Sequence, residues 1–473
     1  MAILALLLLL PCAATRADTI VLKNGRRIAA SNVREEGDKV KYETSAGELA
    51  LPKSIVDHIE RGGAAAAMEP QAWGANLPAT PSATLDGAAG GEIERGAVHG
   101  NAIDRSYIAK LENEASSGER RAGKNAALAH HAAAEFEMSR GDLEHALTDE
   151  RTALTYAPED PALMTIVGYL HLRRSEYRQS LDYLERARRV QPDNADVAKL
   201  EGWAYYGMNK LNQAVAEWKR SLALRPDPEV QAALDKAERD KQEEDKYREN
   251  ESTHFTLRYT GTAEPALARG VLRTLEGHFS AIESELNFTP PDSIGVILYT
   301  QQAFADITRA PGWVSALNDG RIRVPVQGLG DVTPELSRVL KHELTHSFIR
   351  QKTRGLAPTW IQEGLAQWVE GKRSAQGAAA LVQVYQAGQM APLRTLEGSW
   401  MKLPGELAGY AYAWSLANIE YIVEKDGMGD MERILDRIAS GSSTEEALHD
   451  VLHSDYEELM KSTAEYLRKT YVR

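Results

Sequence analysis

The sequence predicts a multidomain α+β protein with a small N-terminal β module, an α-helical repeat region and a C-terminal α/β domain that ends in a mainly helical tail. Three observations predict this fold class. A short segment after residue 17 alternates in the manner of β-strands, a middle segment repeats every 34 residues, and the chain from Ser252 onward mixes strand and helix patterns. The length of 473 residues leaves room for two to four domains.

The charge balance argues against a nucleic-acid partner. The formal net charge is −13, and no long run of lysine or arginine occurs. Binding to phosphates needs basic patches, so we expect no nucleic acid among the partners.

The N-terminus resembles a secretory signal peptide spanning residues 1–17. Residues 2–10 are all apolar, and small residues follow up to Ala17, after which cleavage is expected. The apolar run is shorter than the ~20 residues that span a bilayer, and no other segment predicts a transmembrane helix. We therefore expect a secreted or periplasmic protein whose mature chain has no cysteine. An uncleaved anchor, or one lipidated at Cys12, is the alternative.

Residues 18–60 predict a small β module. Thr19–Leu22 leads into Asn24-Gly25, a dipeptide typical of hairpin turns, and Val40 and Tyr42 alternate with lysines. The pattern resembles small SH3-like or Sm-like barrels. Residues 61–101 are rich in Ala, Gly and Pro without periodicity, which predicts a linker.

Residues 102–251 contain the repeat. Pro158, Pro192 and Pro226 are spaced by 34 residues, and Gly168 and Gly202 share that register. Small residues at fixed places let paired helices approach closely, and the period resembles that of the tetratricopeptide repeat. The expected units are 127–160, 161–194 and 195–228, the first with Ala134 in place of glycine. The charged stretch 235–251 is expected to form a capping helix with a solvated face.

The resemblance to tetratricopeptide repeats implies a groove for a peptide or a protein partner, and a simple spacer arm is the alternative. His130 and His131 lie in this region without an evident carboxylate partner. We interpret them as surface or packing residues.

The region 252–473 begins with α/β texture. Strands are expected at 254–259, 294–299 and 321–326, and a helix at 267–286. Pro325 favours an edge position for the third strand. From Thr333 onward the pattern is mainly helical, with Thr333 as N-cap and Pro334 in the first turn.

The helix that starts at Thr333 carries the chemistry. His342 and His346 are four residues apart, so they lie on one helical face and can present nitrogens to one ion. Glu343 lies beside that face, where it can reach a metal-bound water without binding the metal. This is the H-E-x-x-H arrangement.

A hydrolytic zinc site needs three protein ligands and an open position. Glu363 is the expected third ligand, on a second helix that begins near Pro358 after the chain turns back through 352–357. Glu370 is the alternative ligand. Trp360 and Ala366 are expected to pack in the core.

Together, His342-Glu343-x-x-His346 and Trp360-x-x-Glu363-Gly364-x-Ala366 resemble the gluzincin metallopeptidases. The likeness is greatest to the peptidase MA-like domains found beside tetratricopeptide repeats, and it covers roughly residues 252–473. It implies a zincin-like fold and a metallopeptidase that hydrolyses peptides or proteins.

The resemblance also implies roles for individual residues. One Zn²⁺ per chain is held by His342, His346 and Glu363, and Glu343 is the general base. Tyr412 is the candidate donor to the developing oxyanion, and the segment 320–326 is the candidate strand that pairs with substrate. The competing hypotheses are an envelope scaffold with an inactive zinc domain, and zinc-dependent hydrolysis of a substrate other than a peptide.

Overall fold

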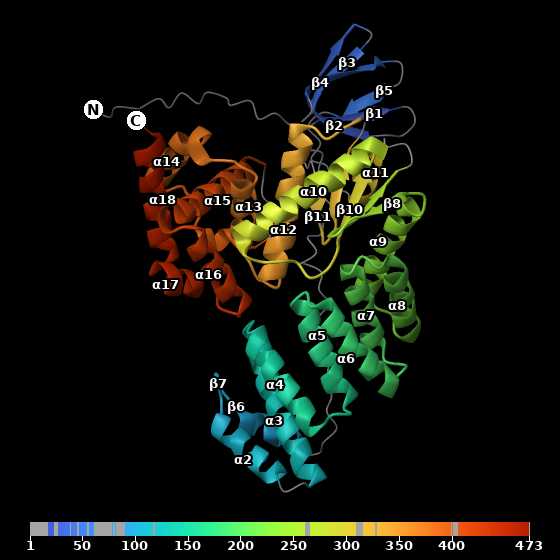
Figure 1. Cartoon of the computed structure of the whole chain (residues 1–473), viewed down its shortest axis with the longest axis vertical. Coiled ribbons are helices and arrows are strands. Elements are labelled where there is room, and N and C mark those ends of the chain that lie inside the picture. Colours follow the sequence, from blue (N-terminus) through green and yellow to red (C-terminus); the bar gives the residue numbers. More distant parts are fainter. Residues whose placement is uncertain are drawn as a thin grey trace, which may run out of the picture. The chain divides into compact units, whose positions relative to one another are not determined.

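The structure is a computed structural model of the chain. It describes residues 18–22, 27–37, 39–44, 47–53, 56–60, 78, 81, 90–116, 119–260, 265–308, 316–326, 329–398, 400 and 405–472. The expected signal peptide and the Asn24-Gly25 turn lie outside these residues. The described chain is mostly helical (Figure 1). It divides into two compact units: Met1–Pro70 with Phe304–Ser315, and Gln71–Ala303 with Ala316–Arg473.

The first unit contains a five-stranded antiparallel sheet in the segment predicted as a β module. Its order is β4-β3-β2-β1-β5, so the first strand pairs with both the second and the last. Val33 and Val40 are buried, while Lys39 is exposed, as strand alternation requires. Likeness to SH3-like or Sm-like barrels stays a prediction. The strands are β1 (Asp18–Leu22), β2 (Arg27–Glu36), β3 (Lys39–Thr44), β4 (Gly47–Pro52) and β5 (Val56–Glu60).

Helical structure begins earlier than the sequence predicts. The sequence predicts a linker over 61–101, but α1 (Gly90–Ala97) and the strand β6 (Val98–His99) lie within this segment. Ile93 and Ala97 of α1 are buried against α3. The last part of the expected linker therefore belongs to a small core, because two apolar side chains one turn apart face the next helices. β7 (Ala102–Ile103) and α2 (Arg105–Ala115) follow.

The middle of the chain forms consecutive helix pairs with the predicted period. Each helix packs on the next along the chain, and the buried faces form one apolar cluster. The 34-residue period reappears in the starts of α5 and α7, whereas membership of the tetratricopeptide family stays a prediction. The helices are α3 (Arg120–Ser139), α4 (Leu143–Tyr156), α5 (Pro161–Arg173), α6 (Tyr177–Val190), α7 (Ala195–Gly207), α8 (Leu211–Leu224) and α9 (Pro228–Glu244).

The repeated glycines have the packing role that the sequence predicts. A Cβ at Gly168 would lie 2.7 Å from Cγ of Leu184, and one at Gly202 would lie 2.4 Å from Cδ1 of Trp218. Neither distance is possible between real atoms. Glycine at this register therefore lets α5 and α7 approach α6 and α8 closely.

The charged stretch 235–251 differs from the prediction in two ways. The helix α9 ends at Glu244, and β8 (Arg248–Glu251) pairs with β9 instead of continuing a capping helix. Asp240 and Glu244 are buried, not solvated. The sequence could not indicate this, because the cations that accompany these carboxylates lie about 80 residues later in the chain.

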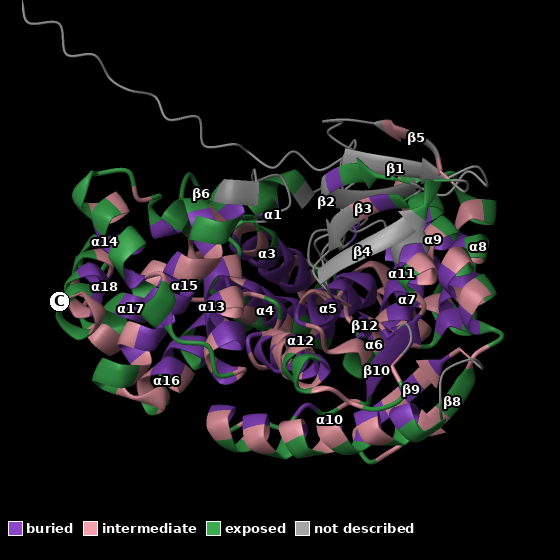
Figure 2. Ribbon diagram, turned by 90° about the horizontal axis from the view of Figure 1, so that it is seen from above, coloured by how far each residue is buried: buried purple, intermediate pink, exposed green. Residues whose placement is uncertain are grey.

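The second unit contains a mixed five-stranded sheet with the order β11-β12-β10-β9-β8. β9, β10 and β12 are parallel, and the short outer strands β8 and β11 are antiparallel to their neighbours. α10 (Pro265–Leu286) connects β9 to β10 and carries buried residues on one side and exposed residues on the other (Figure 2). The remaining strands of this unit are β9 (Phe255–Tyr259), β10 (Ile294–Tyr299), β11 (Leu317–Asn318) and β12 (Ile322–Pro325). α11 (Gln301–Thr308) follows β10, and its residues from Phe304 onward belong to the first unit.

The prediction that the 320–326 strand is a free edge strand is wrong for its first half. β11 pairs with β12 at Ile322 and Arg323, and both side chains are fully buried. Pro325 is tolerated because it lies beyond the last residue that pairs with β11. The edge of the sheet next to the motif helix is therefore β11.

The tail is helical, as predicted, and packs with the sheet and α10 in one apolar core. Thr333 caps the first helix of the tail: its hydroxyl accepts a hydrogen bond from the Leu336 amide at 3.1 Å. The elements are α12 (Pro334–Lys352), α13 (Thr359–Val369), η3 (Ser374–Gln376), α14 (Ala378–Gln386), η4 (Leu393–Leu396), α15 (Gly405–Asp426), α16 (Met428–Ala439), α17 (Thr444–Leu452) and α18 (Tyr456–Tyr471). Among the described helices, none has both the length and the apolarity needed to cross a bilayer.

A buried ion network joins the last repeat helix to the sheet. Asp240 of α9 accepts hydrogen bonds from Arg321 at 2.5 Å and from Arg323 at 2.8 and 3.1 Å. Glu244 accepts from Arg321 at 2.9 Å, and Asp319 accepts from Arg323 at 3.0 Å. The sequence predicts a domain boundary at Ser252, but this network makes α9 part of the same compact unit as the sheet.

Removal of one carboxylate from this network tests how far the unit depends on it. We expect Asp240→Ala to lower the free energy of unfolding by about 3–5 kcal/mol, because it leaves two arginines buried without their shared partner. Urea denaturation of the whole chain measures the change.

Asp235→Ala is the matched control, since Asp235 is exposed on the same helix. Its effect should stay within about 0.5 kcal/mol. Equal midpoints for the two variants would show that the network adds nothing to stability.

Candidate metal centre

The helix α12 brings the two predicted histidines together. Their Nε2 atoms are 3.1 Å apart, and the rings meet edge to face with centroids 4.8 Å apart. Both side chains are largely buried, and Ile349 on the same stripe is fully buried. The four-residue spacing therefore produces two imidazole nitrogens that face the same point.

The helix α13 adds the predicted carboxylate. Oε2 of Glu363 lies 3.5 Å from Nε2 of His342 and 3.6 Å from Nε2 of His346. In the part of the chain that the structure describes, one group of three or more His, Cys, Asp or Glu side chains has its ligand atoms within 4.8 Å of one another. This group, called the cluster below, consists of His342, His346 and Glu363.

Gly364 lets α13 approach α15 beside Glu363. A Cβ at this position would lie 2.5 Å from the backbone oxygen of Ser415. The Gln367 side-chain amide also donates to the backbone oxygens of Glu363 and Tyr412, both at 3.0 Å. Trp360 and Ala366, predicted as packing residues, are fully buried. In the Glu-Gly pair of the motif, Glu363 supplies the carboxylate, and Gly364, which has no side chain, allows α13 to lie close to α15.

The three groups fit a divalent ion of the size of zinc. Zinc holds nitrogen and oxygen ligands at about 2.0–2.1 Å, so two ligands of one tetrahedral ion lie about 3.3 Å apart. The observed separations of 3.1, 3.5 and 3.6 Å bracket that value. Two imidazoles and one carboxylate also form a donor set that zinc accepts in hydrolytic sites.

Glu370 occupies a different position from the one that a ligand needs. Its Oε1 lies 3.6 Å from Nδ1 of His342, on the far side of the ring from the shared Nε2 point, and 2.6 Å from Nζ of Lys372. A carboxylate at that nitrogen orients the imidazole and fixes which nitrogen is free to bind metal. The geometry therefore favours Glu363 over Glu370 as the third ligand.

Glu343 is nearly buried beside the cluster, at 9% exposure. Burial raises the pKa of its carboxyl to about 7, an effect that the neighbouring His342 opposes and that Glu363 and Glu370 reinforce. The Asn318 side chain donates to the backbone oxygen of Glu343 at 2.6 Å and to the Ser347 hydroxyl at 2.7 Å. The edge strand β11 is therefore fastened to the motif helix at Glu343.

The residues of the cluster shift one another's pKa values. Burial alone lowers the pKa of both histidines, but the carboxylates of Glu363 and Glu370 overcome it at His342 and raise its pKa to about 10. At His346 burial prevails, aided by His342, and the pKa falls to about 4. Burial opposes ionisation of Glu363, yet both histidines hold its pKa below the ordinary value.

Tyr412 of α15 is half-buried and packs edge to face on Trp400, with ring centroids 5.1 Å apart. Burial raises the pKa of its phenol, and Glu363 and Glu343 raise it further. The hydroxyl therefore lies within electrostatic reach of the cluster and stays protonated. A protonated phenol can donate a hydrogen bond.

Residues 327–469 match the Peptidase MA superfamily. This match covers less than a third of the chain, but it includes the helices that carry all the residues of the cluster. It supports a peptidase MA-like domain in the C-terminal region, as the motif predicts. A comparison with curated proteins found no match to this chain.

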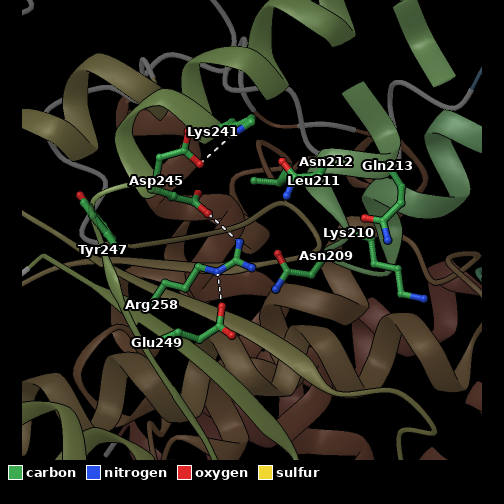
Figure 3. A pocket seen from close by; sticks show the side chains of 11 residues that line it. Asn209, Lys210, Leu211, Asn212, Gln213, Lys241, Asp245, Tyr247, Glu249 and Arg258 are labelled. Carbon is green, nitrogen blue, oxygen red and sulfur yellow. Dashed lines mark hydrogen bonds and ion pairs between the residues drawn. The ribbon is translucent and has the colours of Figure 1, made fainter. Parts of the chain in front are cut away.

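A cavity of about 370 Å³ lies beside the start of α8, the end of α9 and the strands β8 and β9. Several of its charged side chains pair with one another: Arg258 donates to Glu249 at 2.8 Å, and Lys241 donates to Asp245 at 2.7 Å (Figure 3). None of the three cluster residues lines it. Its lining comprises Asn209, Lys210, Leu211, Asn212, Gln213, Lys241, Glu244, Asp245, Tyr247, Glu249 and Arg258.

The structure corrects the interpretation of His130 and His131 as residues without carboxylate partners. Both are buried, and α4 supplies a partner to each. His130 Nδ1 lies 2.8 Å from Asp149, and His131 Nδ1 lies 3.0 Å from Glu150. The two residues of each pair are 19 positions apart, which is the signal in the sequence that could have revealed them. That separation has meaning only once α3 and α4 are known to be antiparallel neighbours.

These pairs shift the pKa values of both histidines in the same direction. Burial opposes protonation, but Asp149 and Glu112 outweigh it at His130, and Glu150 outweighs it at His131, so both pKa values rise above 6.5. The folded state then binds more protons than the unfolded state near neutral pH. The stabilisation is complete below pH 6.5 and is lost as the pH rises through the raised folded pKa values.

We therefore expect the double variant His130→Gln/His131→Gln to lose stability mainly at low pH. The deficit relative to the unmodified chain should be about 1–3 kcal/mol near pH 6 and should shrink near pH 9. Urea denaturation at the two pH values measures it. His449→Gln, at a mostly exposed side chain, is the control and should follow the unmodified chain at both. A deficit that grows with pH would contradict the pairing.

Proposed function

We propose that the chain is a zinc-dependent peptide hydrolase of the gluzincin type, in which His342, His346 and Glu363 hold one Zn²⁺. The convergence of these three groups beside the buried Glu343 carries the proposal. The superfamily match supports it, since such domains are typically zinc-dependent. Three protein ligands leave one position open, as hydrolytic zinc sites require.

Glu343 is the proposed general base. When bound, zinc polarises the scissile carbonyl and lowers the pKa of a water molecule in its open position to about 7. The Glu343 carboxylate would accept a proton from the attacking water and would then return it to the departing amine nitrogen. Its burial excludes bulk water from this transfer, and the bond from Asn318 fixes the helix turn that carries it.

Tyr412 and β11 are proposed to position the substrate. The protonated phenol of Tyr412 donates to the carbonyl oxygen as negative charge develops there. Because β12 is paired on both sides at Ile322 and Arg323, the substrate backbone is assigned to the outer edge of β11, whose Asn318 already contacts the motif helix.

The remaining parts of the chain have proposed roles that depend on sequence alone. The segment 1–17 directs secretion to the periplasm or exterior, or anchors the chain in the membrane if it is retained. The helices α3–α9 recruit a peptide or protein substrate or a partner protein, as their resemblance to tetratricopeptide repeats implies. An envelope scaffold with an inactive zinc domain is the alternative function.

The assignment of the third ligand is tested by paired alanine variants. We expect Glu363→Ala to weaken zinc binding by more than about 100-fold, and Glu370→Ala to weaken it by about 10- to 100-fold, as for other residues that orient a metal-bound histidine. Competition with a chromophoric chelator measures both affinities. The reverse order of the two effects would make Glu370 the ligand.

The mechanism is tested by Glu343→Gln. This variant should bind about one zinc per chain and cleave casein or a peptide library about 10²- to 10⁴-fold more slowly than the unmodified chain, because it keeps the shape of the side chain but cannot accept a proton.

Glu335→Gln makes the same chemical change at an exposed position of the same helix and should cleave at the unmodified rate. Equal cleavage by Glu343→Gln would remove the proposed mechanism. Zinc binding without cleavage by the unmodified chain would favour the scaffold.

A further inference from the structure

The turn between α12 and α13 determines how the third ligand reaches the two histidines. α12 ends at Lys352 and α13 begins at Thr359, so the turn in between sets the direction in which Glu363 is presented. Arg354 and Gly355 in this turn both have left-handed backbone conformations, with φ of 55° and 75°. An arginine in that conformation is strained and persists only where surrounding contacts hold it.

Arg354 is held by carboxylates of the repeat helices. Its Nη1 donates to Glu144 of α4 at 2.5 Å, and its Nε lies 3.6 Å from Glu176, at the start of α6. The same Nη1 donates to the backbone oxygen of Ala439, at the end of α16, at 3.3 Å. Three elements distant in sequence therefore converge on one guanidinium.

The two carboxylates are themselves fixed on the repeat side. Arg174, which is buried, donates to Glu144 and, at 3.1 Å, to Glu176. His171 Nδ1 lies 2.7 Å from Glu176. The carboxylates are thus already ordered by the repeats, and Arg354 binds to a prepared acidic pair.

Apolar contact reinforces the charged one. Leu356 in the same turn packs against the apolar core of the repeat helices and also against the core that contains α12 and α13. The turn is also closed from within, since the Thr353 hydroxyl donates to the Ile349 oxygen at 2.7 Å and the Gly355 amide donates to the Arg350 oxygen at 2.7 Å. The turn therefore lies between two cores and is fastened to both.

We propose that Arg354 is a positioning residue through which the repeat helices set the approach of Glu363 to His342 and His346. The effect of Arg354 on zinc binding rests on the proposed function. Its effect on the conformation of the turn and of the start of α13 does not. The repeats then act on the site itself, in addition to any recruiting role. Removal of the guanidinium allows the strained turn to relax, and the start of α13 relaxes with it.

The effect of Arg354 on the turn is measured by amide hydrogen exchange of the metal-free whole chain. Arg354→Ala should raise the exchange rate of residues 353–363 by about tenfold, and Glu144→Gln should act in the same direction. The double variant should exchange no faster than Arg354→Ala alone, because both changes remove one interaction. Arg338→Ala removes an exposed arginine of α12, outside the turn, and should leave the exchange of residues 353–363 unchanged.

The effect of Arg354 on zinc affinity is measured by chelator competition on the same proteins. Arg354→Ala should bind one zinc about tenfold more weakly than the unmodified chain, Arg354→Lys should fall in between, and Arg338→Ala should equal the unmodified chain. A structural role without influence on the site would lower thermal stability and leave zinc affinity unchanged.

The outcomes separate the two proposals. Unchanged exchange of residues 353–363 in Arg354→Ala, or additive effects in the double variant, overturns the positioning role. Faster exchange with unchanged zinc affinity overturns its link to the site. An unmodified chain that binds no zinc overturns the proposed function, and the exchange result still decides the positioning role.

Discussion

The buried pairing of Asp240 and Glu244 with Arg321 and Arg323 is the interaction on which the second unit depends. Charges removed from water are stable only when each has a partner in good geometry, so α9 and β12 must meet in one register. β12 in turn pairs with β11, and Asn318 of β11 bonds to the motif helix at Glu343. A chain of direct contacts therefore runs from the last repeat helix to the cluster.

The cluster assigns different tasks to three carboxylates through their surroundings. Glu363 faces the two Nε2 atoms, Glu370 faces the opposite nitrogen of His342, and Glu343 lies buried beside them without entering the ligand triangle. The chemistry of the side chains is nearly the same in each case. Their direction and burial make Glu363 the candidate ion-binding group, Glu370 the candidate orienting group and Glu343 the candidate proton carrier.

Several groups of contacts join the repeat helices to the C-terminal region, and two of them lead toward the cluster. At one, α9 is fastened to the sheet by the buried network; at the other, Glu144 and Glu176 hold the turn that carries Arg354. The first is followed along β12 and β11 by Asn318, which bonds to the motif helix, and the second lies in the turn that precedes α13. A repeat module attached only as a recruiting arm would need neither. With the positioning role that we propose for Arg354, the helices α4–α9 are part of the frame that shapes the site.

Features that depend on local geometry are predictable from the amino-acid pattern. A four-residue spacing places His342 and His346 on one helical face wherever that helix lies, Thr333 and Pro334 define its start, and a 34-residue period places Gly168 and Gly202 where helices must approach closely. These features follow from the pitch of a helix and the size of side chains. No distant contact is needed to predict them.

The packing of elements distant in the sequence sets which nitrogen of His342 faces Glu363 and which faces Glu370. It also gives His130 and His131 their partners and buries Asp240 and Glu244. It also placed β11 at the sheet edge where the sequence had favoured β12. Each of these depends on groups that are distant in the chain, and a carboxylate in a sequence looks the same whether it faces water, an arginine or a metal site. Burial and side-chain direction are set by the packing of several elements, whereas periodicity is a property of a single element.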